Sequence, residues 1–241
     1  MCYNAVKQST GQKHILGTQT MQVIKRDGTT EDLNIDKLHR VVMYACEGIT
    51  GVSASEVEIH SQIQFFDKIV TENIQETLIK SAADLISEES PNYQYVAGRL
   101  INYHLRKQVY GTFTPPCLCD IIDDNISAGF YDSEFTELYT KDEINELQTF
   151  IDHNRDEFLT YAAMEQFRGK YLVQNRSTGK LYETPQVAYM MIAATLFGKY
   201  PADTRMKYVK DYYDAISTFK ISLPTPVMAG VRTPQRQFSS C

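Results

Sequence analysis

The sequence predicts a mainly α-helical protein with one small β-hairpin near its N-terminus. Apolar residues recur at helical spacing through most of the chain, as in Leu38, Val41 and Ala45. Short alternating runs on either side of Asp27-Gly28 are typical of two strands joined by a tight turn. Residues preferred at helix starts and helix ends also stand at the matching positions.

Residues 21–111 are predicted to contain this hairpin and four helices. Asn34 or Asp36 can cap the first helix, because both side chains accept hydrogen bonds from free backbone N–H groups. The second and third helices are "SEVEIHSQIQFF" and "TENIQETLIKSAADLISEE". The fourth helix, "PNYQYVAGRLINYHLRKQVYG", opens with Pro91 and closes at Gly111, which are the residues preferred at those ends.

The rest of the chain is predicted to be mostly helical and then extended. "TFTPPC" is typical of a linker, and a second hairpin is expected in "KYLVQNRSTGKLYETP". Helices are expected near 185–198 and 202–219, followed by extended "KISLPTPVMAGVRTPQRQFSSC". Residues 1–20 are polar and without pattern, so we expect them to form a flexible extension.

Composition narrows the class of protein. The chain has 241 residues, of which 43% are hydrophobic and 22% charged, as in soluble globular proteins. A formal charge of −6 argues against a nucleic-acid partner, which requires a basic surface. No apolar run approaches the roughly 20 residues of a membrane span. We therefore expect a cytoplasmic protein without nucleic-acid or membrane partners.

The cysteines do not predict a metal site. The five cysteines, at positions 2, 46, 117, 119 and 241, lack the spacing of known metal-ligand motifs. In a reducing compartment the expectation is five free thiols. Cys46 is expected to pack in a helical core, and Cys117 and Cys119 to be incidental at a helix start.

Cationic residues gather around the predicted hairpin. Lys25 and Arg26 lie on its first strand, and Lys37 lies at the start of the first helix. Thr71 and Lys107 could add a hydroxyl and another cation. Such residues, together with unpaired N–H groups of a helix start, can bind phosphate. Spacing alone leaves open the alternative that these are ordinary exposed side chains.

"VIKRDGTTEDLNIDKLHRVV" and "ADLISEESPNYQYVAGRLINYHLRKQVYG" resemble the ATP-cone, the regulatory nucleotide-binding domain of ribonucleotide reductases. The resemblance implies a four-helix bundle with a β-hairpin lid, in which ATP keeps the enzyme active and dATP inhibits it. It implies effector contacts at Lys25, Glu31, Asp32, Leu33, Asn34, Ile35, Asp36, Lys37, Thr71 and Lys107. Gln75 departs from the histidine common in bacterial members, which leaves inhibition by dATP open.

"STFKISLPTPVMAGVRTPQRQFSSC", with "KYLVQN" and "YETPQ", resembles the large subunit of class I ribonucleotide reductases. There the chain leads into the first strand of a ten-stranded α/β barrel. The resemblance implies that Thr225 and Ser240 contact the ribonucleotide substrate and that Cys241 belongs to the redox-active dithiol. Removing the 2′-hydroxyl needs two electrons, which two thiols supply by forming a disulfide.

The expected organisation follows from both resemblances. A flexible extension spans 1–20, an ATP-cone 21–111, a helical domain 112–220 and the start of the barrel 221–241. The implied enzyme is a ribonucleoside-diphosphate reductase that makes deoxyribonucleotides for DNA synthesis. The rest of its catalytic residues would lie beyond Cys241, so the chain is expected to be inactive without them.

The resemblance also implies partners. These are the C-terminal portion of the large subunit, a small radical-generating subunit that carries the metal-radical centre, and thioredoxin or glutaredoxin. We therefore expect a hetero-oligomer, and favour a split subunit over an interrupted coding sequence. Two other hypotheses stay open: a stand-alone nucleotide-sensing regulatory protein, and a non-catalytic remnant that binds reductase subunits.

Overall fold

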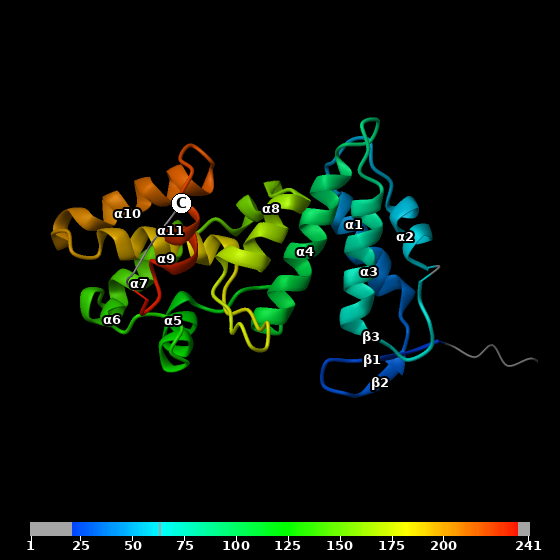
Figure 1. Cartoon of the computed structure of the whole chain (residues 1–241), viewed down its shortest axis with the longest axis horizontal. Helices are drawn as coiled ribbons and strands as arrows, with labels where there is room; N and C mark the ends of the chain where they lie inside the picture. The colour runs from blue at the N-terminus through cyan, green and yellow to red at the C-terminus, as the bar shows by residue number, and fades with distance from the viewer. Residues whose placement is uncertain (1–20, 63, 236–241) are drawn as a thin grey trace, which may run out of the picture.

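The computed structural model describes residues 21–62 and 64–235 (Figure 1). Within these residues the protein is mainly α-helical, with one small sheet near the N-terminus, which confirms the predicted fold class. None of the helices in these two stretches has the length and apolar character needed to cross a membrane. The predictions for residues 1–20, Ser240 and Cys241 concern residues outside the described part.

The N-terminal region, which we define as residues 21–111, contains a three-stranded sheet and four helices. Its elements are β1 (Gln22–Ile24), β2 (Thr30–Asp32), α1 (Ile35–Cys46), α2 (Ala54–Gln62), β3 (Ile69–Val70), α3 (Thr71–Asp84) and α4 (Tyr93–Tyr110). β1 and β2 form the predicted antiparallel hairpin, with Val23 opposite Glu31. β3 was not predicted; it pairs parallel to β1 and places Ile69 opposite Val23.

Local chemistry fixes the hairpin and the first helix. Gly28 has a φ of 82°, in the left-handed region that glycine adopts without strain. The turn is closed by the N–H of Lys25, which donates to the carbonyl of Thr29 at 2.8 Å. The side chain of Asn34 accepts a hydrogen bond from the backbone N–H of Lys37 at 2.9 Å, so Asn34 caps α1.

The C-terminal region, residues 112–235 of the described chain, is built from short helices around a buried one. Its elements are α5 (Leu118–Ser127), α6 (Glu134–Leu138), α7 (Lys141–Phe150), the 3-10 helix η1 (His153–Phe158), α8 (Tyr161–Gln166), the π-helix η2 (Phe167–Tyr171), α9 (Pro185–Phe197), α10 (Ala202–Ser217) and α11 (Thr225–Gly230). Every residue from 185 to 194 is buried. α9 is therefore enclosed by other elements, which agrees with the apolar residues that make up most of its surface.

Helix α4 packs against both regions and joins them (Figure 1). One side contacts α1 and α3, and the other contacts α8 and η1. Gly98 lies where α4 passes the backbone of Leu159, and a Cβ at Gly98 would stand 2.1 Å from the carbonyl oxygen of Leu159. The close packing at this point requires glycine.

The prediction of extended structure after residue 220 is wrong. Residues 225–230 form α11 because Pro226 stands in the first turn, where its fixed φ favours a helix and its missing N–H is not needed. No strand occurs in the described part of the predicted barrel start, residues 221–235. The second predicted hairpin is present in a short form, because the chain turns at residues 176–178 and an antiparallel bridge pairs Gln174 with Leu181.

Candidate functional site

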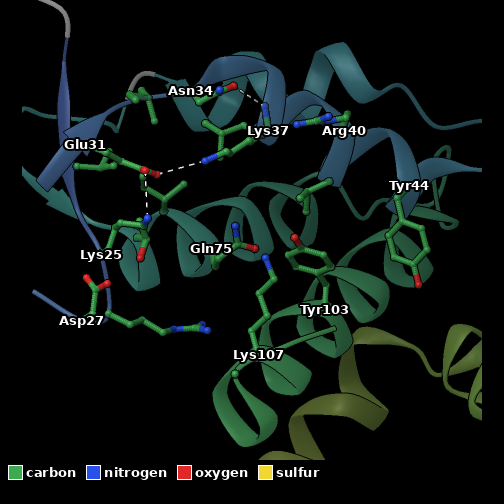
Figure 2. Close-up of a pocket in the computed structure, with 18 residues that line it drawn as sticks. Lys25, Asp27, Glu31, Asn34, Lys37, Arg40, Tyr44, Gln75, Tyr103 and Lys107 are labelled. Atoms are coloured by element: carbon green, nitrogen blue, oxygen red, sulfur yellow. Dashed lines mark hydrogen bonds and ion pairs between the residues drawn. The ribbon is translucent and has the colours of Figure 1, made fainter. Parts of the chain in front are cut away.

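A cavity of about 650 Å³ lies between the small sheet and helices α1, α3 and α4 (Figure 2). We call it the lid cavity. The residues predicted to contact an effector that line it are Lys25, Glu31, Leu33, Asn34, Lys37, Thr71 and Lys107. They come from the hairpin, the starts of α1 and α3 and the last turn of α4, so the fold brings together side chains that lie far apart in the sequence.

Asp32, Ile35 and Asp36 were also predicted but do not line this cavity. In a strand, successive side chains point to opposite faces, so Glu31 faces the cavity and Asp32 faces away. Ile35 and Asp36 belong to the exposed side of the first turn of α1. The Ile35 side chain instead borders a smaller cavity between α1 and α2.

The charge of the lid cavity is predominantly positive. Its cationic residues are Lys25, Arg26, Lys37, Arg40 and Lys107, and its acidic residues are Asp27 and Glu31. Glu31 lies between two cations, 3.2 Å from Lys25 Nζ and 3.4 Å from Lys37 Nζ (Figure 2). The hydrogen bond from Lys25 is the main reason why the pKa of Glu31 is lowered. The excess of cations suits an anionic ligand.

Two helix N-termini lie at the lid cavity. α3 begins at Thr71, and Val70 at its N-cap position provides no side-chain hydrogen bond. The first N–H groups of this 14-residue helix therefore lack a side-chain cap. α1 begins beside Asn34 and Lys37, both of which line the cavity. Backbone N–H groups and the positive end of the helix dipole favour phosphate at such positions.

The wall opposite the hairpin is aromatic. Tyr44 and Tyr103 line the cavity with ring centroids 6.5 Å apart. Lys107 Nζ lies 4.3 Å from the centre of the Tyr103 ring, which holds the cation at the cavity. Burial raises the pKa of Tyr44 to about 12, so its hydroxyl stays protonated at neutral pH. The rings offer flat apolar surface to a base or sugar.

Gln75 supplies an unmet hydrogen-bond acceptor. Its side-chain oxygen is buried and has no partner among the described residues. Gln75 and Lys107 both line the lid cavity, where Figure 2 labels them. A buried acceptor without a donor costs about 1–3 kcal/mol. A ligand with a hydroxyl or amino group at this point would remove that cost.

Sequence reasoning missed Arg40, Tyr44 and Tyr103. A signal for them was present: Arg40 and Tyr44 follow Lys37 by three and seven residues, which places all three on one side of α1. Tyr103 precedes Lys107 by four residues and shares its side of α4. Helical spacing from the predicted cations would have found these neighbours.

Comparisons with known proteins agree with this geometry. The ATP cone domain family matches residues 21–108, and the ribonucleotide reductase all-alpha domain family matches residues 157–236. Ribonucleoside-diphosphate reductase 1 subunit alpha of Escherichia coli K12 is 56% identical over 223 residues, which cover 92% of this chain and 29% of that protein. This chain is homologous to the N-terminal region of the ribonucleotide reductase alpha subunit. The predicted family is thereby confirmed.

Other relatives have the same coverage. The ribonucleoside-diphosphate reductase subunit alpha of Haemophilus influenzae is 55% identical over 92% of this chain and 30% of its own length. That of enterobacteria phage T4 is 44% identical over 92% of this chain and 29% of its own length. The chain thus spans less than a third of the alpha subunits that it matches. The lid cavity lies within the part matched by the ATP cone.

The predicted substrate residue of this reductase homologue, Thr225, is the exposed first residue of α11. The segment behind it is held by Arg232, whose guanidinium is fully buried and paired with Glu183. Arg232 also donates to the carbonyl of Met228 at 2.7 Å and to that of Tyr171 at 2.9 Å. The segment that carries Thr225 is therefore anchored to the core of the C-terminal region.

Two of the described cysteines, Cys46 and Cys119, are thiols with a raised pKa. Cys46 is partly buried, and burial raises its pKa to about 11. Burial also raises the pKa of Cys119. Both stay protonated at neutral pH and are poor nucleophiles. Residues 21–62 and 64–235 contain no group of three or more His, Cys, Asp or Glu side chains arranged to hold a metal ion.

Proposed function

We propose that the lid cavity binds ATP and dATP as allosteric effectors of a ribonucleotide reductase. The observation that carries this proposal is the convergence of five cationic residues, two helix N-termini and an aromatic wall on one cavity. Its volume of about 650 Å³ suits a nucleotide, because small-molecule pockets measure about 300–1,000 Å³.

The triphosphate is the part of the ligand that the cations and helix starts would hold. Lys25, Lys37 and Lys107 supply positive charge, and Thr71 supplies a hydroxyl beside the uncapped N–H groups of α3. Asp32, Ile35 and Asp36 could contribute only backbone groups, since their side chains lie away from the cavity. The unmet acceptor of Gln75 would take a hydrogen bond from a hydroxyl or amino group of the nucleotide.

Calorimetry with the 241-residue chain tests effector binding. We expect ATP to bind in the micromolar range, and Lys107→Met to weaken binding by about tenfold, the loss of one charge-assisted contact. Lys199→Met is the matched control, because Lys199 pairs with Glu134 outside the lid cavity. Absence of heat for both ATP and dATP at millimolar concentration would refute the proposal.

The catalytic role proposed for this chain is that of the N-terminal part of a reductase that converts ribonucleoside diphosphates to deoxyribonucleotides. In this proposal Thr225 and Ser240 contact the substrate and Cys241 is one thiol of the reducing pair. The rest of the large subunit, a small radical-generating subunit, and thioredoxin or glutaredoxin complete the cytoplasmic machinery. Homology to reductase alpha subunits supports it.

Reconstitution tests the catalytic role. The chain would be combined with the remaining part of an alpha subunit, the small subunit and a reductant, and deoxyribonucleotide formation followed over many turnovers. Cys241→Ser should abolish sustained turnover, since a single remaining thiol cannot form the disulfide. Unchanged turnover by the variant would favour a non-catalytic role instead.

A further inference from the structure

A line of charged and hydrogen-bonding side chains leads from the lid cavity into the core of the N-terminal region. Arg26 lines the cavity, and its Nε lies 3.2 Å from Oε1 of Glu72 on α3. A terminal nitrogen of the same guanidinium lies 3.3 Å from Nδ1 of His104, a buried residue of α4. On the other side of the ring, His104 Nε2 lies 3.4 Å from Oε1 of Glu76.

Glu76 connects this line of side chains to the C-terminal region. Its carboxylate accepts two hydrogen bonds from Arg168, at 2.8 and 3.4 Å. Arg168 belongs to the π-helix η2 and is also held by Glu165, at 2.6 and 2.9 Å. Paired contacts of this kind fix the plane and position of a guanidinium. A displacement of the Glu76 carboxylate would therefore directly change the contacts of Arg168 in η2.

The π-helix η2 in turn contacts the segment that carries Thr225. The carbonyl of Tyr171, the last residue of η2, accepts a hydrogen bond from Arg232 at 2.9 Å. Arg232 also donates to the carbonyl of Met228 in α11 at 2.7 Å. Ion pairs, hydrogen bonds, the 3.4 Å approach of His104 Nε2 to Glu76 and one turn of backbone thus connect the lid cavity to α11.

We propose that this line, which begins at Arg26 and ends at Arg168, communicates occupancy of the lid cavity to η2 and α11. The inference rests on the proposed function, since it needs a ligand whose phosphates attract Arg26. It assigns a regulatory role to side chains of α3 and α4 that lie behind the cavity.

Competition for Arg26 is the physical origin of the coupling. While Arg26 donates to Nδ1 of His104, the ring proton lies on Nε2, which faces Glu76 without completing a hydrogen bond. Burial is the main cause that lowers the pKa of His104; Arg26 and Arg168 also lower it, and Glu76 and Glu72 raise it. Moving Arg26 onto phosphate thus favours a charged His104, which would compete with Arg168 for Oε1 of Glu76.

Hydrogen exchange on the 241-residue chain, with and without saturating ATP, tests the inference. In the unmodified chain we expect ATP to change exchange in residues 161–172 and 225–235 by about fivefold, the lower end of typical coupling between sites. Glu76→Gln and Arg168→Gln should each abolish that change while ATP still binds by calorimetry. Arg176→Gln is the matched control, an exposed arginine on the turn after η2, and should retain the response.

The outcomes separate this inference from the proposed function. ATP binding without any change in exchange at 161–172 overturns the inference alone. A response that persists in both Glu76→Gln and Arg168→Gln also overturns it, because the signal would then travel by another route. Absence of ATP binding to the unmodified chain overturns the effector site and the inference together. If one variant fails to fold, as judged by its thermal transition, the other still decides.

Discussion

The charged groups of the lid cavity and those of the C-terminal core differ in their exposure to water. Around the cavity, the side chains of Lys25, Lys37 and Glu31 are 43%, 57% and 36% exposed. In the core, Arg232 and Glu183 are both 0% exposed. Exposed pairs contribute little to folding and can exchange partners, whereas breaking a buried pair leaves an uncompensated charge. The charged side chains at the lid cavity can therefore change partners. The buried pair of Arg232 and Glu183, by contrast, stabilises the fold of the C-terminal region.

The largest loss of stability is expected when the buried pair of Arg232 and Glu183 is broken. Arg232→Met leaves the Glu183 carboxylate buried, with Tyr131 and the backbone N–H of Val173 as its remaining partners among the described residues. We expect the free energy of unfolding to fall by about 3–5 kcal/mol, measured by urea denaturation. The double variant Arg232→Met with Glu183→Leu should recover part of this loss. A single-variant loss below about 1 kcal/mol would contradict the contrast between the two regions.

A smaller loss of stability is expected from a substitution in α4, where this helix packs against the C-terminal region. In Gly98→Ala the new methyl group would overlap the carbonyl of Leu159, so the backbones must separate. Overpacking of this kind costs about 1–3 kcal/mol, measurable as a lower midpoint of urea unfolding. Gly169→Ala is the matched control, because a Cβ there meets no atom within 4 Å. Equal effects of the two substitutions would show that close packing at Gly98 does not matter.

Acidification is expected to act through buried histidines. Burial lowers the pKa of His153 from 6.5 to about 4, so the folded state favours the neutral ring. The stability that this contributes is present above the unfolded pKa and is lost as the pH falls through the folded pKa, between about 6.5 and 4. His153→Gln should therefore flatten the decline in urea stability over this window. An unchanged decline would exclude His153 as its source.

Asp156 is expected to have the opposite effect on the pH dependence of folding stability. Burial raises its pKa from 3.8 to about 6 although Arg106 lies beside it, so its neutral form is favoured in the folded state. Its contribution is fully present below the unfolded pKa and is lost as the pH rises towards 6 and above. Asp156→Asn should remove this opposing term and steepen the loss of stability on acidification. A shallower loss in this variant would reverse the assignment.

The smallest change in the free energy of unfolding is expected from a substitution in the lid cavity itself. Lys37→Met removes an exposed cation from the start of α1, where a positive charge opposes the helix dipole. The free energy of unfolding should therefore change by less than about 1 kcal/mol. ATP affinity should nevertheless fall by about tenfold in calorimetry. Affinity equal to that of the unmodified chain would remove Lys37 from the phosphate site.

Much of the fold followed from local signals. Four helices, the hairpin at Gly28 and the cap at Asn34 are each encoded within a few neighbouring residues, and the structure contains them. The charged part of the lid cavity followed as well, because Lys25 and Lys37 flank that hairpin and cap. Residue type and short-range spacing are sufficient for such features, since the interactions that form them lie within one or two turns of chain.

Other features depended on the tertiary structure. β3 is a two-residue strand, too short to carry a pattern, and it forms only because β1 offers it an edge. The contact of Gly98 with Leu159, and that of Glu76 with Arg168, join residues 61 and 92 positions apart. The sequence by itself determined the helices, the family and the cations of the cavity. Packing of α3 and α4 against η2 and α8 decided how the cavity is connected to the rest, because long-range contacts depend on all elements being in place.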